Sequence, residues 1–305
     1  MKLVLFNDYI PGILRGDAVI DVSSVLADIP RVSPQTLMSG LIERFDQYRG
    51  ALEKAAANAS VGIPVGQVRL RPPLPEPTRI VCMAVNYMEG GTRALPADRD
   101  AFLKSPSAVI GPSDTIVLPD CPVPHFHHEA ELGVVIGKTA SHISAEDAAD
   151  YLFGYVNFMD VSARNVAPNG NNSFFWGKSW DTFAPMGPAI VTADEIKDPH
   201  NLSIKLWVSG ELRQDLSTSD MGRSVWEVME FVTWITTMKA GDIISTGTNH
   251  IGLGPIQDGD SIEMEIEGLG RLAVNVSDEW KRTWPREPLS KMTGFESSIR
   301  SKRSG

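Results

Sequence analysis

Two glutamates, Glu129 and Glu131, stand at the head of an apolar run that is closed by Gly137. The run is rich in β-branched residues, which predicts a strand over Glu129–Ile136, and side chains two apart on a strand share one face. Two adjacent carboxylates repel each other, and removing them from water is costly. A divalent cation bound by both would remove this conflict, so the pattern predicts a metal site with oxygen ligands. The competing interpretation is a solvated strand face at a sheet edge.

A third carboxylate, Asp160, follows the predicted strand Gly154–Met159. A carboxylate at a strand end can turn into a central cleft, where it would join Glu129 and Glu131 on one side of a cation. Three carboxylates without a sulfur ligand favour Mg²⁺ or Mn²⁺ over Zn²⁺, with Ca²⁺ as an alternative. Asp160 could instead cap the turn that follows it, which is a common role for aspartate.

Lys178 and Thr248 add two polar groups to this set. Lys178 lies in the segment Gly177–Phe183, which we predict to be a loop, and a lysine beside three carboxylates would offset their charge and orient a water molecule. Thr248 ends the run Ser245–Thr248 behind a predicted strand, and the hydroxyl and N–H groups of such a turn can bind a substrate carboxylate. Both patterns are common in proteins, so ordinary solvated roles remain open on spacing alone.

Several short motifs occur in order between Thr78 and Val276. They are Arg79–Cys82, Asn86-Tyr87, Phe102–Ser107, His128–Glu131, Asp160–Arg164, Gly177–Ser179 with Asp181–Phe183, and Thr246–Thr248. In this order they resemble the fumarylacetoacetate hydrolase (FAH) family, and the resemblance covers most of the chain. It implies an α+β, mainly β fold: a mixed β-sandwich roll with the site in its mouth, usually in a dimer.

The resemblance also implies roles for individual residues. Glu129, Glu131 and Asp160 match the metal-binding triad of the family. Lys178 matches its active-site lysine, and Thr248 matches its contact to the substrate carboxylate. The remaining substrate-binding assignments are Lys104, Asn86 and Tyr87, which lie in the matching motifs.

Four positions depart from the family pattern. Members that hydrolyse a C–C bond often carry Asn-Tyr-x-x-His-x-x-Glu, but here Gly90 stands at the histidine position and Arg93 at the glutamate position. A His–Glu pair can activate water, whereas glycine cannot. Asn165 and Asn249 replace an aspartate and a proline that family members usually carry.

His250 is our first candidate for the missing base because it follows the Thr-Gly-Thr turn, and Glu89 is the second because it lies in the predicted lid, Met88–Asp100. Alternatively, the cation and Lys178 activate water without a side-chain base. We expect the lid to be mobile without substrate because it holds Gly90-Gly91 and few apolar side chains. At least two of three further histidines are interpreted as packing or surface residues: His125, His127 and His128.

Composition divides the chain into three predicted parts. Residues 1–75 form a small N-terminal α/β domain, and the proline-rich run at 72–77 marks its end. Residues 76–285 form the FAH-type catalytic domain. Residues 286–305 form a polar, basic tail.

In the N-terminal part we predict strands at Leu3–Phe6 and Ala18–Val22 around a turn at Pro11-Gly12, then a helix from Ser33-Pro34 to about Ala59. Strands dominate the catalytic part. The strands predicted there are Arg79–Val85, Glu129–Ile136, Gly154–Met159, Ala189–Thr192, Leu202–Val208 and Asp242–Thr246, with a hairpin of Ser261–Ile266 and Leu272–Val276. The helices predicted there are Ala145–Tyr151 and Ser224–Met238.

Length and charge limit the function classes. The chain has 305 residues, a net charge of −10 and a pI of about 5.1, which argues against a nucleic-acid-binding surface. No apolar run approaches the roughly 20 residues of a membrane span. Two cysteines without metal-type spacing fit a reducing compartment, so we expect a cytoplasmic protein.

These observations predict a divalent-metal-dependent hydrolase that cleaves a C–C bond in a small β-diketo or 2-oxo acid, such as an acylpyruvate or a fumarylacetoacetate-like compound of aromatic catabolism. A homodimer is expected from the family. The alternative is a decarboxylase, isomerase or lyase that uses the same metal-stabilised enolate. A third hypothesis is a metal-binding family member without catalytic activity.

Overall fold

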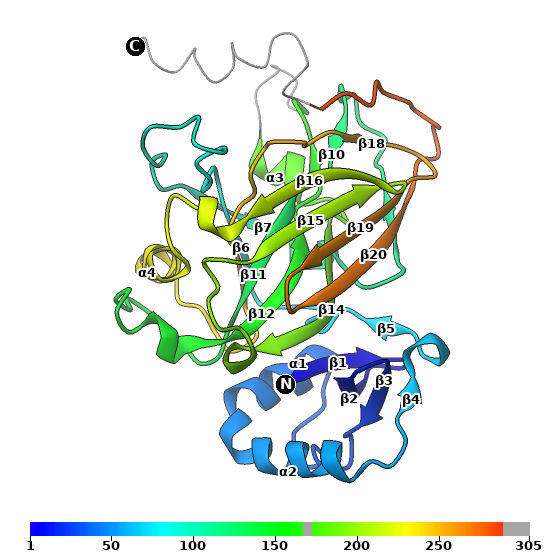
Figure 1. Cartoon of the computed structure of the whole chain (residues 1–305), viewed down its shortest axis with the longest axis vertical. Coiled ribbons are helices and arrows are strands. Elements are labelled where there is room, and N and C mark those ends of the chain that lie inside the picture. Colours follow the sequence, from blue (N-terminus) through cyan, green and yellow to red (C-terminus); the bar gives the residue numbers. More distant parts are fainter. Residues whose placement is uncertain (167–172, 289–305) are drawn as a thin grey trace.

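The computed structural model describes residues 1–166 and 173–288, and three β-sheets form the framework of this part of the chain (Figure 1). The largest sheet has twelve strands, and its main path is β4-β3-β2-β1-β14-β12-β11-β17-β6-β7, with β5 beside β1 and β8 beside β14. Its strands are β1 (Lys2–Phe6), β2 (Ile10–Arg15), β3 (Ala18–Asp21), β4 (Ile63–Pro64), β5 (Leu70–Arg71), β6 (Ile80–Met83), β7 (Ala101–Lys104), β8 (Val109–Ile110), β11 (Ala130–Ile136), β12 (Leu152–Met159), β14 (Ala184–Thr192) and β17 (Ile243–Ser245).

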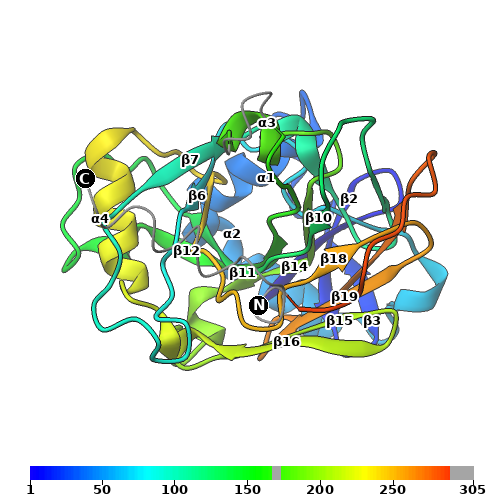
Figure 2. The same ribbon diagram turned by 90° about the horizontal axis from the view of Figure 1, so that it is seen from above.

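A five-stranded sheet packs against the large one as a second layer (Figures 1 and 2). Its order is β16-β15-β19-β20-β9, and a three-stranded sheet, β13-β10-β18, lies near one end of the sandwich. The strands of these two sheets are β9 (Thr115–Val117), β10 (Phe126–His127), β13 (Ser162–Ala163), β15 (Ser203–Val208), β16 (Glu211–Ser217), β18 (Pro255–Ile256), β19 (Ser261–Ile266) and β20 (Gly270–Ser277). The mainly β, α+β class expected from the sequence is confirmed.

Burial explains which strands are continuous apolar runs. Every residue of β11 is buried, and so is β12 after its first residue, because other layers cover both faces of these central strands. β19 alternates between buried and exposed residues, as a strand with one solvated face does. Buried Asn157 joins the two layers, since its amide donates to Gly187 O at 2.9 Å and Gly270 O at 3.0 Å.

Two of the predicted helices differ in the structure. The helix expected from Ser33 to Ala59 is two helices, because Arg44 leaves the helical region at φ −114° and ψ 24°. The helix expected over Ala145–Tyr151 is wrong, since only a short 3₁₀ turn forms there. The helices are α1 (Pro34–Glu43), α2 (Phe45–Asn58), α3 (Phe174–Lys178) and α4 (Val225–Ile235), with 3₁₀ turns at Val65–Gln67, Pro106–Ala108, Ala148–Tyr151, Ala193–Glu195 and Thr218–Asp220.

The turn predicted at Pro11-Gly12 is also wrong, because both residues lie inside β2 and pair with β1. The hairpin instead turns between Phe6 and Ile10, where Asn7 and Tyr9 take positive φ values of 49° and 58°. Gly12 serves close packing, since a Cβ there would come within 2.7 Å of a methyl group of Val19.

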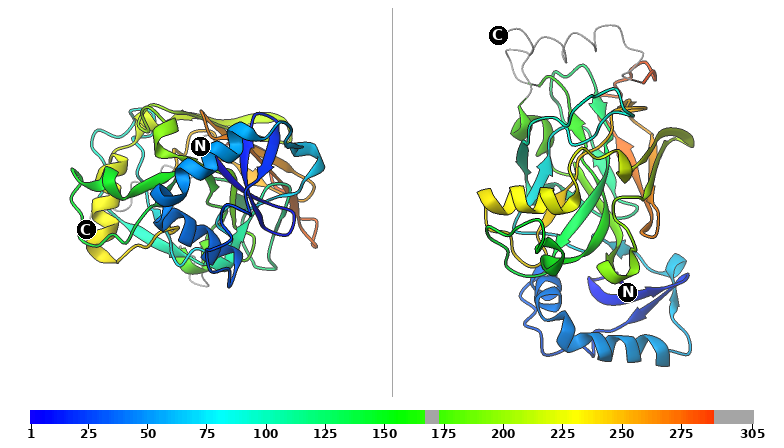
Figure 3. Two further views of the ribbon diagram at one scale, coloured as in Figure 1. Left: turned by 90° about the horizontal axis from the view of Figure 1, so that it is seen from below. Right: turned by 60° about the vertical axis from the view of Figure 1, so that its left-hand side comes forward.

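The N-terminal segment lies at one end of the molecule, and α3 and β10 lie at the opposite end (Figures 1 and 3). β1 pairs with β14, so the segment extends the large sheet. Leu3 and Leu5 belong to the same apolar core as β11 and β12. A separate domain over residues 1–75 therefore stays a prediction, and most of the predicted tail, 289–305, lies outside the described residues. No helix in the described residues has the length and apolarity needed to cross a membrane.

Candidate metal centre and active site

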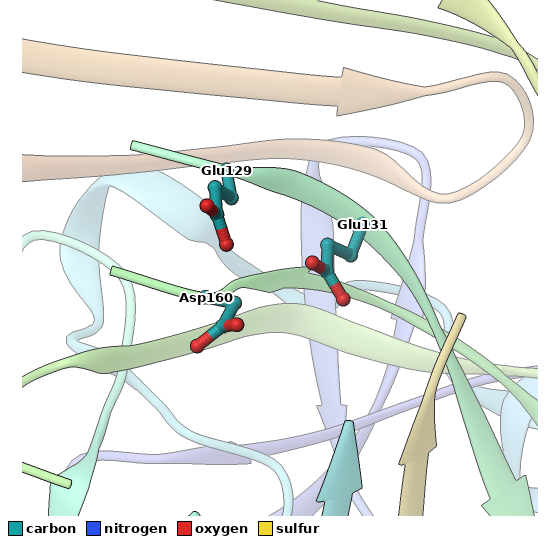
Figure 4. A group of neighbouring side chains, drawn as sticks. All are labelled: Glu129, Glu131 and Asp160. Atoms are coloured by element: carbon teal, nitrogen blue, oxygen red, sulfur yellow. The ribbon is translucent and has the colours of Figure 1, made fainter. Parts of the chain in front are cut away.

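The three predicted metal ligands converge at the ends of two paired strands. Glu131 lies in β11, Glu129 directly precedes it, and Asp160 directly follows β12. β11 and β12 are antiparallel, and the amide of Asp160 donates to the carbonyl of Glu129 at 3.0 Å, which sets the two chain positions opposite each other. The carboxylates point toward one another (Figure 4), and one oxygen from each lies within 4.8 Å of the others.

Three buried or half-buried cations surround this triad. Lys178 Nζ donates to Glu129 Oε2 and Asp160 Oδ2, both at 2.5 Å. Arg164 binds the other oxygen of Glu129. Lys104 Nζ donates to Asp160 Oδ1 at 2.6 Å. Three positive side chains thus lie among three negative ones, which lowers the free-energy cost of burying the carboxylates.

The surroundings shift the pKa values of the two glutamates in opposite directions. Burial raises the pKa of Glu131, and Asp160 and Glu129 raise it further, to well above its usual range. Burial also acts to raise the pKa of Glu129, but Arg164 and Lys178 outweigh it and hold that pKa well below its usual range. Burial lowers the pKa of Lys178, but Asp160 and Glu129 more than compensate and raise it. Burial and neighbouring carboxylates raise the pKa of a carboxyl group and nearby cations lower it, which explains the opposite shifts of Glu131 and Glu129.

The triad fits a divalent cation. Its ligand atoms are all oxygen and its carboxylates are buried, and a bound cation would offset both the burial and the repulsion that raise the pKa of Glu131. Ser245 Oγ and Gly247 N donate to Glu131 Oε2 at 2.5 and 3.0 Å, which fixes the orientation of that carboxylate. Oxygen-only ligand sets favour Mg²⁺, Mn²⁺ or Ca²⁺ over softer metals.

A cavity of about 90 Å³ opens beside the triad. His250, Thr248 and Lys178 line it together with the three carboxylates. The structure thus brings the predicted base and the predicted metal ligands to one cavity. Its lining residues are Met83, Ala84, Val85, Phe102, Glu129, Glu131, Asp160, Arg164, Phe174, Lys178, Thr248 and His250.

His250 and Glu89, predicted separately as replacement bases, form one pair. His250 Nδ1 lies 2.5 Å from Glu89 Oε1, and the amide of His250 donates to Glu89 Oε2 at 2.8 Å. A carboxylate at Nδ1 favours the tautomer with the proton on Nδ1, so Nε2 becomes the basic atom of the ring. The chain therefore joins a histidine and a glutamate across the site, although Gly90 and Arg93 replace the family pair.

The backbone around Glu89 is shaped for this contact. Glu89 has a φ of 56° and Gly90 a φ of 62°, so the chain turns sharply at the start of the lid. Asp220 accepts hydrogen bonds from Gly90 N at 3.1 Å and from the Asn249 side chain at 2.5 Å. A Cβ on Gly90 would come within 2.9 Å of Ile251. Asp220 thus ties the lid turn to the loop that carries His250.

Lys104 and Thr248 both use their polar atoms inside the protein. Besides Asp160, Lys104 Nζ donates to the carbonyls of Val161 and Lys178, so its three hydrogens are all engaged. Thr248 Oγ1 donates to Ala130 O at 2.8 Å and accepts from the Gln214 side chain at 3.0 Å. The substrate contacts predicted for these two residues stay predictions, and their hydrogen bonds give them a positioning role.

Asn86 and Tyr87 hold the loop next to the site. Asn86 Nδ2 donates to Thr246 O at 3.0 Å, and Asn86 Oδ1 accepts from Arg223 N at 3.1 Å. Tyr87 is buried and lies outside the cavity lining described above. Their substrate-binding role also stays a prediction.

The three upstream histidines pack behind the triad. His125 stacks on His127, whose Nδ1 accepts from Arg164 Nε at 3.0 Å. His128 Nδ1 faces Gln214 Oε1 at 3.0 Å, and burial lowers the pKa of His128 to about 4. The interpretation of these histidines as packing residues agrees with these contacts.

A family model described as fumarylacetoacetate (FAA) hydrolase C-terminal matches residues 79–277. The chain belongs to the fumarylacetoacetate hydrolase family. Oxaloacetate tautomerase YisK of Bacillus subtilis is 39% identical over 224 residues, which are 70% of this chain and 74% of that protein. The mitochondrial oxaloacetate tautomerase Fahd2a of Rattus norvegicus is 34% identical over 272 residues, 86% of this chain and 84% of that one.

Solved structures show the same family fold. Maleylpyruvate hydrolase from Sphingobium sp. SYK-6, in complex with manganese(II) ion and pyruvate, matches with a TM-score of 0.82 and 37% sequence identity. The match covers 91% of this chain and 99% of that chain. The FAH-type fold predicted from the motifs is therefore confirmed.

Sequence reasoning gave no role to two residues that organise the site. Arg164 belongs to the quoted motif Asp160–Arg164, and a cation so close to a predicted ligand was a usable signal. Gln214 uses its whole amide, accepting from Ala130 N and His128 and donating to Thr248 and Asn249. β16, which carries Gln214, is polar along most of its length, so nothing in its sequence distinguished this side chain.

Proposed function

We propose that this FAH-family enzyme uses Mg²⁺ or Mn²⁺ to hydrolyse a C–C bond in a small β-diketo or 2-oxo acid of the acylpyruvate type. The observation that carries the proposal is that His250, paired with Glu89, lines the same cavity as the carboxylate triad. Hydrolysis needs a group that removes a proton from water, and this pair supplies one. The matching maleylpyruvate hydrolase supports the same reaction class.

The triad of Glu129, Glu131 and Asp160 would hold the cation. When bound, the cation supplies positive charge that stabilises negative charge developing on a substrate oxygen. The three triad carboxylates are already balanced by Lys104, Lys178 and Arg164, so a dication leaves the site positive. An anionic substrate is therefore favoured over a neutral one.

The chain's own residues divide the proton transfers. His250 Nε2 accepts a proton from the water that attacks the acyl carbonyl carbon, while Glu89 stabilises the imidazolium. The C–C bond then breaks, and its electron pair stays with the 2-oxo acid as an enolate. A proton from His250 returns to the enolate carbon, which yields a carboxylic acid and pyruvate. Lys178, held between Glu129 and Asp160, keeps both carboxylates oriented toward the cavity.

Keto–enol tautomerisation is the second candidate function. Two relatives that this chain matches over most of its length are oxaloacetate tautomerases. The same base would move a proton between carbon and oxygen without attack by water. Decarboxylase and lyase activities would use the same enolate, and a non-catalytic role is the least supported because the triad and the His–Glu pair are both complete.

A metal-supplemented reaction screen tests the proposal. The full chain is incubated with Mn²⁺ or Mg²⁺ and either an acylpyruvate or oxaloacetate, and NMR identifies the products. Hydrolysis gives equal amounts of carboxylate and pyruvate. Faster loss of the enol absorbance without new products would favour the tautomerase. Rates equal to those of buffer for every substrate and metal would contradict both.

The remaining expectations belong to the same proposal. We expect a homodimer, a cytoplasmic location and a role in aromatic catabolism. Light scattering coupled to size exclusion measures the oligomeric state directly, and a monomeric mass at micromolar concentration would contradict the dimer.

A further inference from the structure

Five of the residues that line the active-site cavity are apolar, and we call them the apolar wall: Met83, Ala84, Val85, Phe102 and Phe174. Met83 is buried, and Ala84 and Phe102 are half-buried. The rings of Phe102 and Phe174 stack at 4.5 Å with an interplanar angle of 3°. Val85 is 39% exposed and Phe174 is 43% exposed. Large apolar side chains gain by being covered, so this uncovered wall marks a contact surface for a ligand.

The backbone at Val85 gives an independent sign of function. Val85 has a φ of 58°, in the left-handed region that β-branched residues rarely occupy. Such strain persists only where the surrounding structure holds it, and it is concentrated at binding and catalytic sites. The loop is held from both sides, because Ala84 N donates to Asp100 O at 2.9 Å and Asn86 bonds Thr246 O. The strained turn keeps an exposed valine beside the cavity.

The positively charged side chains of the cavity lining are already bound to carboxylates. Among its lining residues the cations are Arg164 and Lys178, and both bind the carboxylates of the triad. Lys178 Nζ also lies 5.3 Å from the centre of the Phe102 ring, on the triad side of the apolar wall. Among the residues that the structure describes, the lining therefore offers positive charge at the triad and none at the apolar wall.

From this division we infer that the substrate is a 2-oxo acid with one carboxylate, whose far end is an uncharged alkyl or aryl group. The inference rests on the proposed function, and it names the substrate class of that site. The oxo-acid end lies at the triad, and the apolar end covers Val85, Phe102 and Phe174. A second carboxylate at the far end would lose its hydration against this wall without gaining a cation.

Ligand binding to the Mn²⁺-loaded full chain tests the inference without turnover. The matched probes are 2-oxohexanoate and 2-oxoadipate, which have the same chain length and differ in a terminal methyl or carboxylate group. Titration calorimetry should give an affinity at least tenfold higher for 2-oxohexanoate. It should also exceed that of pyruvate, by roughly three- to fourfold for each methylene group that the wall covers.

Variants of the wall locate the effect. Phe174→Ala and Val85→Ala should each weaken 2-oxohexanoate binding about fivefold or more and leave pyruvate binding within twofold. Phe174→Arg should reverse the preference toward 2-oxoadipate. Phe175→Ala is the control, because Phe175 is the next residue of α3, is 75% exposed and lies outside the cavity lining described above.

The outcomes separate this inference from the proposed function. If pyruvate binds but 2-oxoadipate binds as tightly as 2-oxohexanoate, or more tightly, the apolar substrate class is wrong and the function stands. In that case Arg93 of the lid becomes the candidate anchor for a second carboxylate. If neither pyruvate nor any longer 2-oxo acid binds the Mn²⁺-loaded protein, both the function and the inference are overturned.

Discussion

At the scale of single residues, the contact between His250 and Glu89 makes a sharp kinetic prediction. His250→Ala should lower kcat about 10²–10⁴-fold, the usual range for a positioned acid–base. Glu89→Gln should lower it less, because the histidine keeps its lone pair but loses the carboxylate that stabilises its charged form. The double variant should match His250→Ala, since the two residues act as one unit.

His142→Ala is the matched control for that series, because His142 is exposed and lies away from the cavity lining. Independent, multiplicative losses in the double variant would contradict a coupled pair. A near-wild-type rate for His250→Ala with a severe loss for Lys178→Met would instead assign water activation to the cation and lysine.

The carboxylate triad predicts a change in metal affinity. Glu131→Gln removes a charged ligand but keeps an oxygen and the approximate size, so Mn²⁺ affinity should fall at least about tenfold. Titration calorimetry measures this directly, with exposed Glu53→Gln as the control. An unchanged affinity would show that Glu131 is not a ligand.

How much of the site the sequence could predict depended on the kind of residue. Glu129, Glu131 and Asp160 were predictable because charges next to buried strands are unusual and because their motif is specific. The union of Glu89 and His250 was not, since it joins residues 161 positions apart in the chain. The contact between Glu89 and His250 also depends on a positive φ at Glu89, and no local sequence pattern predicts a positive φ for a glutamate.

At the scale of elements, the lid has two halves with different predicted mobility. The amides of Met88, Gly91 and Arg93 donate to backbone carbonyls, and that of Gly90 donates to Asp220. Residues 94–99 donate no backbone hydrogen bond to any residue the structure describes. Hydrogen exchange should therefore be slow for residues 88–93 and fast for residues 94–99.

Slow exchange at residues 88–93 would limit the predicted mobility to the second half of the lid, whereas the sequence-based prediction made the whole lid mobile. Uniformly fast exchange across residues 88–99 would contradict the hydrogen bonds that tie the lid turn to Asp220 and His250. Uniformly slow exchange would contradict a mobile second half.

Regular elements followed the sequence where burial imposed a clear period. The buried runs of β11 and β12 and the alternating strand β15 were predicted within two residues, because strand spacing and apolar content agree there. Gly177 and Lys178 were predicted to open a loop but are the last residues of α3, whose five residues are too few to show a helical period. The break at Arg44 was missed because arginine favours helices and nothing local marks an end.

At the scale of the whole molecule, the half-buried imidazole of His125 predicts how stability depends on pH. Burial, followed by the charge of Arg164, lowers the pKa of His125 to about 4 from 6.5. Between pH 6.5 and 4, His125 is therefore protonated in the unfolded chain and neutral in the folded chain. The contribution of His125 to the free energy of unfolding is fully present above pH 6.5 and is lost as the pH falls toward 4.

His125→Phe can keep the stack on His127 but cannot titrate. Between pH 7.5 and 5, urea unfolding of the wild type should lose about 1 kcal/mol more than the variant does, after allowance for partial solvent exposure. Exposed His142→Gln should follow the wild type. Identical losses in His125→Phe and the wild type would remove His125 from the acid response.

The strained turn at Val85 implies that thermal stability and substrate selectivity make opposite demands on this residue. Glycine tolerates a φ of 58° without the steric penalty of a branched side chain, so Val85→Gly should raise the free energy of unfolding by about 1 kcal/mol. The same change would remove the side chain that covers an apolar substrate end. Selection for thermal stability alone would then favour a more stable enzyme that accepts a wider range of substrates. Calorimetric melting temperatures, measured together with the affinities for 2-oxohexanoate and 2-oxoadipate, would test this. A variant that melts lower than the wild type would mean that this turn stores no strain to release.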